Sequence, residues 1–286
     1  MVVAFFSPYC SYTKRYAQAN QIKKMKLLLW TLLLFTNLSF AQLNEKFFMD
    51  FLNESELKSE NMLTDFSHFD YTNAWSQSPN EIIFGIIGLE HQRIQIKLLT
   101  IKKNSNNPNE YIVTGKSRVK ETICEFKGTI TLTKNWEVKE LHFGVDNEYS
   151  DKGIKTQGVL IANYSFIENS EQNHSGIFKG QLYTKWYLNS NNEVVYDDIE
   201  SISDGYTNNA FIGTWKSNSS GKEKLCNWAD WRVPNANHDF DVGAGEFSVS
   251  EKYWNKGWLD IALKNQIPNE AIVREKSDKE LKDWWE

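Results

Sequence analysis

The feature that most constrains the fold of this chain is a two-residue alternation of apolar and polar side chains between Glu81 and Ser217. Side chains alternate between the two faces of a β-strand, so this period predicts strands that each bury one face. Segments rich in Asn, Ser, Asp and Gly separate the runs and are typical of turns. We therefore expect an antiparallel meander of strands over residues 82–88, 92–103, 110–121, 122–134, 136–145, 157–168, 176–189, 193–198 and 210–218.

The phase of the alternation indicates which side chains face the core. Within residues 122–132 the even positions are mainly apolar, whereas the odd positions include Glu125 and Lys127. The even face is therefore expected to be buried. The same rule predicts the following inward side chains: Cys124, Phe126, Ile130, Leu132, Leu160, Ala162, Tyr164, Phe166, Ile94, Ile96 and Leu98.

A Phe-x-Gly pattern occurs three times, at Phe126–Gly128, Phe178–Gly180 and Phe211–Gly213. A glycine two residues after an inward phenylalanine suits a bent strand with a close backbone approach. Bent strands in a meander of this length favour closure, which removes exposed edges. We predict an all-β fold, an antiparallel meander closing into a barrel or half-barrel, with a short N-terminal helical segment and a C-terminal helix.

An export signal is indicated near the start of the chain. The segment from Met25 to Ala41 has a basic residue, a short apolar run, and small residues before a cleavage position at Gln42. We interpret residues 25–41 as a signal peptide and residues 1–24 as an upstream extension produced by an early start. The expected location is therefore the periplasm or the extracellular medium.

The net charge of the chain and the length of its apolar run limit the kinds of partner that the protein could bind. Residues 1–41 hold five Lys/Arg and no acidic residue, so the remainder carries 27 basic and 37 acidic residues. A net charge of this sign argues against nucleic-acid binding, which needs clustered Lys and Arg. The apolar run of residues 25–41 is shorter than the roughly 20 residues that span a bilayer. No transmembrane segment is expected after signal removal.

The remaining chain is divided into three regions. Residues 42–80 predict an N-terminal helical and aromatic segment, and residues 81–217 the β-barrel-like meander. Residues 218–286 form a tryptophan-rich extension that we expect to wrap against or plug the barrel. Its end, from Asn269, is predicted to be helical.

One stretch, residues 224–247, concentrates the candidate chemistry. Exposed tryptophans flanked by charges would form a sugar-stacking or partner-binding patch, whereas buried ones would be core residues. A histidine with carboxylates suits a hard metal, but the spacing matches neither a calcium loop nor a zinc motif. We assign no metal, no cofactor and no catalytic residue, and retain these ligand or partner candidates: Trp228, Asp230, Trp231, Arg232, His238, Asp241 and Glu246.

Two cysteines, Cys124 and Cys226, remain after residues 1–41 are set aside. In an oxidising compartment they are a candidate disulfide, and two buried thiols are the alternative. Cys226 and His238 would also suit a nucleophile–base pair. The inward phase of Cys124 and the export signal favour the disulfide.

Two resemblances bear on the fold. The sequence "FIGTWKS" is similar to the Gly-x-Trp of calycin-type barrels such as lipocalins and avidins, although here it lies late in the chain. The region from Ile83 to Trp258, through "SDGYTNNAFIGTWKS" and "CNWADWRVPNANHDFDVGAGEF", resembles exported β-rich proteins of unknown function from Gram-negative bacteria. This second resemblance implies an exported β-rich protein and no particular activity.

The sequence favours a non-enzymatic binding protein over an enzyme. Its ligand would be a small molecule, a glycan or a protein, held at the mouth of a barrel. One alternative is a hydrolase of glycan or cell-wall material that uses carboxylates or His238. Another is an inhibitor or interaction module with a solid barrel.

Overall fold

The computed structural model describes residues 56–241, 247–266 and 284–286. These residues belong to the second of two compact units, which extends from Leu52 to Glu286. The predictions for residues 1–55, which include the signal peptide, lie outside the described residues.

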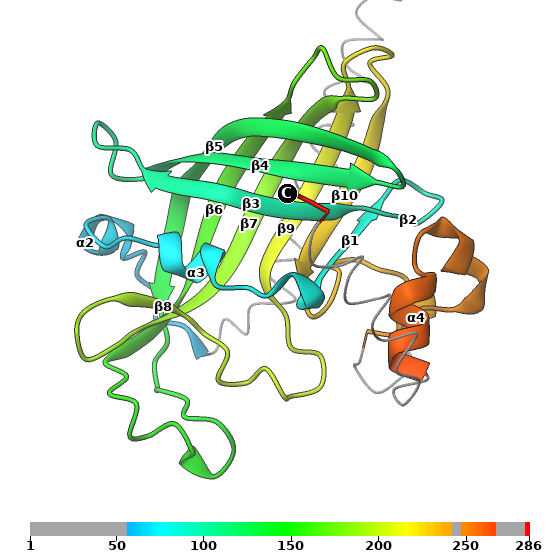
Figure 1. Ribbon diagram of the computed structural model, residues 1–286. Coiled ribbons are helices and arrows are strands. Elements are labelled where there is room, and N and C mark those ends of the chain that lie inside the picture. Colours follow the sequence, from blue (N-terminus) through cyan, green and yellow to red (C-terminus); the bar gives the residue numbers. More distant parts are fainter. Residues whose placement is uncertain (1–55, 242–246, 267–283) are drawn as a thin grey trace, which may run out of the picture. The chain divides into compact units, whose positions relative to one another are not determined.

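The described unit is built on one antiparallel sheet, which confirms the all-β prediction (Figure 1). Along the sheet the order is β2-β1-β10-β9-β7-β6-β5-β4-β3, and β8 pairs with β7. The strands are β1 (Ile83–Ile87), β2 (Gln92–Arg93), β3 (Gln95–Lys103), β4 (Glu110–Val119), β5 (Thr122–Glu137), β6 (Thr156–Glu168), β7 (Gly176–Leu188), β8 (Val194–Tyr196), β9 (Asn208–Ser217) and β10 (Glu223–Asp230).

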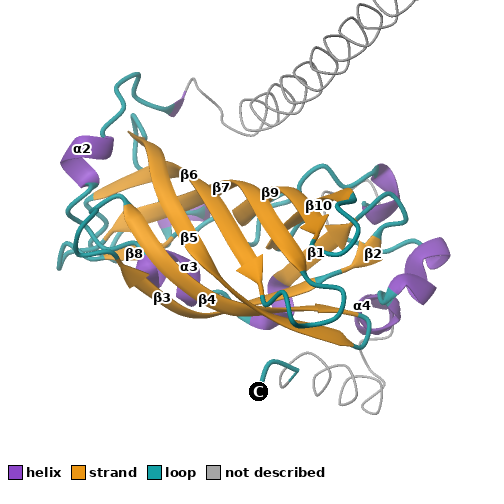
Figure 2. Ribbon diagram, turned by 90° about the horizontal axis from the view of Figure 1, so that it is seen from above, coloured by secondary structure: helices purple, strands orange, loops and turns teal. Residues whose placement is uncertain are grey.

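The sheet curls into a half-barrel whose two ends meet over a short stretch (Figure 2). Only Ile94 separates β2 from β3, so one segment pairs with β1 at its start and with β4 further on. The Ile94 N–H donates to the Gly85 carbonyl at 3.0 Å. A Cβ at Gly85 would lie 2.6 Å from the Ile94 carbonyl oxygen, so glycine permits this approach.

The predicted inward phase is confirmed on β5 and β6. Cys124, Phe126 and Ile130 are buried, whereas Ile123 and Glu125 are exposed. The predicted close approach at the Phe-x-Gly glycines is also present. A Cβ at Gly128 or Gly180 would overlap the backbone of the neighbouring strand, so these glycines allow the sheet to bend.

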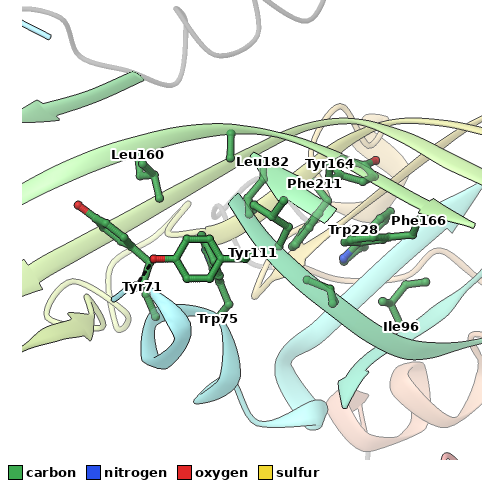
Figure 3. Close-up of a cluster of buried hydrophobic side chains, with 14 of the residues drawn as sticks. Tyr71, Trp75, Ile96, Tyr111, Leu160, Tyr164, Phe166, Leu182, Phe211 and Trp228 are labelled. Atoms are coloured by element: carbon green, nitrogen blue, oxygen red, sulfur yellow. Dashed lines mark hydrogen bonds between the residues drawn. The ribbon is translucent and has the colours of Figure 1, made fainter. Parts of the chain in front are cut away.

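The N-terminal segment fills one end of the curled sheet. Its short helices are α2 (Leu63–Phe66) and α3 (Thr72–Ser76). Tyr71 and Trp75 enter the main core, where the Tyr71 N–H donates to the Tyr111 hydroxyl at 3.0 Å (Figure 3). We expected the C-terminal extension to wrap or plug the barrel. In the structure residues 71–75 form the plug, because the aromatic side chains of Tyr71 and Trp75 fill the apolar interior.

The C-terminal extension packs against the outer face of the sheet. Phe84 and Ile86, the outward residues of β1, contact a separate apolar cluster. Its buried members are Val233, Phe240, Phe247, Val249, Trp258, Ile261 and Ala262. The helix α4 (Leu259–Gln266) belongs to this cluster, whereas most of the helix predicted from Asn269 lies outside the described residues.

Two predicted boundaries differ from the structure. The sheet continues past Ser217 into β10, whose inward Cys226 and Trp228 keep the alternation. Residues 136–145 are not a separate strand, since β5 runs unbroken to Glu137 and the chain then leaves the sheet. Val138 forms only an isolated bridge with Leu57. Among the described residues, no helix is long and apolar enough to cross a bilayer.

Candidate functional site

The structure separates the seven predicted site residues into two groups. Trp228 and Asp230 are buried inside the barrel, each 2 % exposed. Trp231, Arg232, His238 and Asp241 lie beyond the end of β10, outside the barrel interior. Glu246 lies outside the described residues. The predicted patch therefore does not form one surface.

Asp230 keeps the inward phase of Cys226 and Trp228 along β10. Trp228 pairs with Phe211 of β9 and Asp230 pairs with Asn208, so the register shifts between them. Three steps along β9 match two along β10, which places the extra residue of this bulge on β9. On the opposite strand Asn209 has a φ of +44°, a region in which asparagine is several-fold enriched.

Side chains from three elements hold the Asp230 carboxylate. The Ser78 hydroxyl donates to Oδ2 at 2.6 Å, and the Asn209 amide donates to the same oxygen at 3.1 Å. Burial raises the pKa of Asp230 to about 7, and hydrogen bonds from Ser78, Tyr196 and Asn209 oppose the rise. Within the described residues Asp230 forms no ion pair, and neutral donors hold its carboxylate.

Asn209 connects this carboxylate to the N-terminal plug. Its Nδ2 also donates to the Ala74 carbonyl at 2.9 Å, and its Oδ1 accepts from the Thr184 hydroxyl at 3.0 Å. The indole N–H of Trp75 donates to the same Thr184 oxygen at 2.9 Å. The network therefore fixes the plug against β7, β9 and β10.

A small cavity, which we call the Asp230 pocket, lies beside this network. Its volume is about 30 Å³, which corresponds to roughly two water molecules. The residues of its wall that matter for binding are Trp75, Ser78, Lys97, Phe211, Trp228 and Asp230. Figure 3 shows Trp75, Phe211 and Trp228 in the surrounding aromatic core.

The pocket contains an unpaired donor. Four tryptophans are buried in the described part of the chain, and the indole N–H groups of Trp75, Trp186 and Trp258 each donate to a protein oxygen. No such bond is present for Trp228 within the described ranges. Figure 3 shows its indole nitrogen on the side of the ring that faces Trp75. Unlike the Tyr164 and Tyr196 hydroxyls, this nitrogen is not one of the fully enclosed side-chain atoms that lack a partner.

Lys97 lines the same pocket without pairing to Asp230. Its Nζ donates to the Asn80 side chain at 2.8 Å, and burial lowers the pKa of this ammonium group. The pocket therefore presents an acceptor, an unpaired donor and a cation at different points of its wall.

The outer group of predicted residues performs packing and pairing. Arg232 forms an ion pair with Asp241, and Asp239 forms one with Lys252. Asn237 caps the following 3-10 turn by accepting from the Asp239 N–H at 3.0 Å. These contacts hold the loop over the outer cluster.

The described residues of the 224–247 stretch, which are 224–241 and 247, offer no arrangement suited to a metal. His238 is 95 % exposed, and within the described residues no group of three His, Cys, Asp or Glu side chains is arranged to hold a metal. His238 also lies on the outside of the barrel whereas Cys226 is fully buried. The nucleophile–base pairing is therefore wrong.

The predicted Cys124–Cys226 disulfide is absent, and both thiols are free and buried. Cys124 lies on β5 and Cys226 on β10, and three strands separate them in the sheet order. Bonded cysteines need Cα atoms within about 7 Å. The shared inward phase is correct, but it does not place the two residues on adjacent strands.

A second buried carboxylate, Glu168, was missed. Its Oε2 accepts from the Gly176 N–H at 2.6 Å and from the Trp215 indole at 2.9 Å, and Ser117 donates to Oε1. Burial raises the pKa of Glu168, and these three donors oppose the rise. Extending the inward phase of 158–166 by two residues would have identified this side chain.

The chain was compared with protein-family models, curated protein sequences and solved structures, and none of them matches it. The resemblances to calycin-type barrels and to exported proteins of Gram-negative bacteria stay predictions.

Proposed function

We propose that the protein is an exported, non-enzymatic binding protein that receives part of its ligand in the Asp230 pocket. The observation that carries this proposal is that one cavity is lined by both a buried acceptor, Asp230, and a donor without a protein acceptor, the Trp228 indole. Small-molecule sites are typically apolar with a few convergent polar groups.

The packing of the core limits the size of the ligand that the barrel can hold. Aromatic side chains fill the barrel, and Trp186, Tyr111, Phe126, Phe166 and Phe178 are among the largest fully buried ones. This packing does not favour a central chamber of the kind expected from a lipocalin-type resemblance. The proposed ligand therefore enters the pocket with one small group and keeps the rest outside.

The hydrolase alternative gains no support from this pocket. A glycosidase needs two carboxyl groups on either side of a sugar ring. A cavity of about 30 Å³ does not hold a ring.

The filled core favours one second candidate, a solid-barrel interaction module. In that case the 23 buried side chains of the main core serve stability alone, and partners would bind the outer surface. This candidate requires that small molecules leave the pocket unchanged.

An NMR titration of the full chain separates the two candidates. The indole N–H signals of Trp75 and Trp228 are followed while sugars, polyols, amines, amino acids and carboxylates are added one at a time. The binding-protein proposal expects at least one class to shift both signals in a saturable manner. If no class does so, the pocket is not a ligand site and the interaction module is the better function.

Export has its own test. The full chain is expressed in a Gram-negative host, and the form recovered outside the cytoplasm is sequenced from its N-terminus. We expect it to begin at Gln42. An N-terminus at Met1 or Met25 in the cytoplasmic fraction would contradict export.

A further inference from the structure

We propose that the Asp230 pocket binds a hydroxymethyl group, the –CH₂OH end of a polyol or sugar. This inference rests on the proposed binding function and specifies the ligand chemistry of the same site.

The polar groups of the pocket match a hydroxyl. A hydroxyl donates one hydrogen bond and accepts others. It can donate to the Asp230 carboxylate, which accepts from Ser78 and Asn209 through Oδ2 and lies near the Tyr196 hydroxyl. It can accept from the Trp228 indole N–H, which lacks a protein acceptor. A hydroxyl therefore supplies both a donor for the carboxylate and an acceptor for the indole.

The size and lining of the pocket match the rest of the group. A hydroxymethyl has two heavy atoms, similar to the two waters that about 30 Å³ admits. Its methylene would contact Trp75 and Phe211, which are apolar walls. The Phe211 and Trp228 rings stack with centroids 4.5 Å apart and planes 12° from parallel, so the wall behind the group is already ordered.

Charged occupants fit less well. An ammonium group has no acceptor for the Trp228 N–H, and Lys97 already places a cation at the wall. A carboxylate would be repelled by Asp230. A divalent metal takes six or more oxygen ligands, which one carboxylate, one serine and one asparagine do not supply.

The experiment compares sugars that differ only in this group. The ¹⁵N–¹H signal of the Trp228 indole, assigned from a Trp228→Phe spectrum, is followed during titration of the full chain. The probes are methyl glucoside and methyl xyloside, which lacks the hydroxymethyl. We expect the glucoside to shift the signal and to bind at least about tenfold more tightly than the xyloside, because the xyloside leaves the donor and acceptor unpaired.

Smaller probes identify the source of the group. Ethanol and glycerol carry –CH₂OH without a ring, and ethylammonium chloride and sodium acetate are size-matched ions. Binding of glycerol with no binding of the glucoside assigns the pocket to free polyols. Binding of the glucoside in preference to glycerol assigns it to sugars. Either result supports the hydroxymethyl.

Variants connect the binding to the two polar groups. Trp228→Phe is expected to weaken binding about three- to tenfold through the loss of a neutral donor, and Asp230→Asn about tenfold or more through the loss of a charged acceptor. The matched control is Trp258→Phe, a buried tryptophan whose N–H donates to the His91 carbonyl in the outer cluster. It should leave binding unchanged. Because the wild-type sugar comparison needs no variant, the test does not depend on their folding.

Three results would overturn the inference: binding of both glucoside and xyloside with equal affinity, binding of ethylammonium or acetate alone, or no shift with any hydroxymethyl compound. If an ion or another class of molecule still shifts the indole signals, the hydroxymethyl inference fails and the binding function stands. If nothing shifts them, both fail.

Discussion

Two buried carboxylates, Glu168 and Asp230, occupy different parts of the barrel interior. Their oxygens are hydrogen-bonded in different ways. Glu168 accepts from Ser117, from the Gly176 backbone and from the Trp215 indole, so both of its oxygens are engaged. Asp230 accepts from Ser78 and Asn209 on one oxygen, lies near the Tyr196 hydroxyl and faces a cavity. A fully hydrogen-bonded carboxylate fixes a fold, whereas one beside an empty space can still accept from a ligand.

The largest expected effect is the pH dependence of stability. The pKa of Asp230 is about 7 in the fold and 3.8 for an unperturbed side chain. A raised acid pKa stabilises the fold below pH 3.8, and this contribution is lost as the pH rises through 7. The loss amounts to about 4 kcal/mol of unfolding free energy for a fully buried group. Urea titrations from pH 4 to pH 8 measure it.

Asp230→Asn supplies the control, since it should flatten that slope and be as stable as the wild type or more so at pH 8. Asp198→Asn, an exposed carboxylate of the same type, should leave the slope unchanged. An equally steep slope in Asp230→Asn would show that another group carries the pH dependence.

A second comparison concerns the donors around Glu168. Glu168→Leu leaves three donors without their acceptor, and we expect it to destabilise the fold by about 3 kcal/mol at pH 7. Glu168→Gln should cost less than half as much, because its carbonyl still accepts and its amide can donate to Ser117. Denaturant unfolding measures both, and equal losses would mean that packing, not hydrogen bonding, explains the effect.

The alkylation rate of the Cys124 thiol reports on the buried environment that it shares with Glu168. Burial, with a smaller contribution from Glu168, raises the pKa of Cys124 from 9.0 to about 11. Alkylation at pH 8 should then be about a hundredfold slower than for a free thiol, because the thiolate is the reactive form. Unfolding the chain from Gln42 onward, which lacks Cys10, should release two reactive thiols from Cys124 and Cys226 without reductant. Fewer than two would restore the disulfide hypothesis.

The smallest effect is expected outside the barrel. His238 is 95 % exposed, so His238→Ala should change the unfolding free energy by less than about 0.5 kcal/mol. It should also leave sugar binding and the response to EDTA unchanged. A loss of binding in this variant would move the ligand site away from Asp230 and toward the outer loop.

The sequence predicted most of the sheet because alternation records burial directly, although it missed β10 and predicted a strand over 136–145 that is not present. It predicted the inward faces of β5 and β6 and the close approach at Gly128 and Gly180. It could not predict which inward residues meet. Cys124 and Cys226 share a phase, yet their strands are separated in the sheet order. Adjacency depends on topology, which period alone does not encode.

The candidate site was only half predictable for a related reason. Trp228 and Asp230 were selected for their chemistry, but their separation from Trp231 and His238 depends on the end of β10 at Asp230. Ser78 and Asn209 were not selected, because they lie in other segments and carry common side chains. Their role arises only when the N-terminal plug enters the barrel.

The position of that plug in the chain also has a kinetic consequence. Trp75 bonds to Thr184, 109 residues later, and α3 has only five residues, too few to be stable alone. The plug therefore remains unstructured until β7 and β9 exist to receive it. Contacts of such long range slow folding, so we expect the aromatic plug of a newly made chain to stay exposed until β7 and β9 have been synthesised.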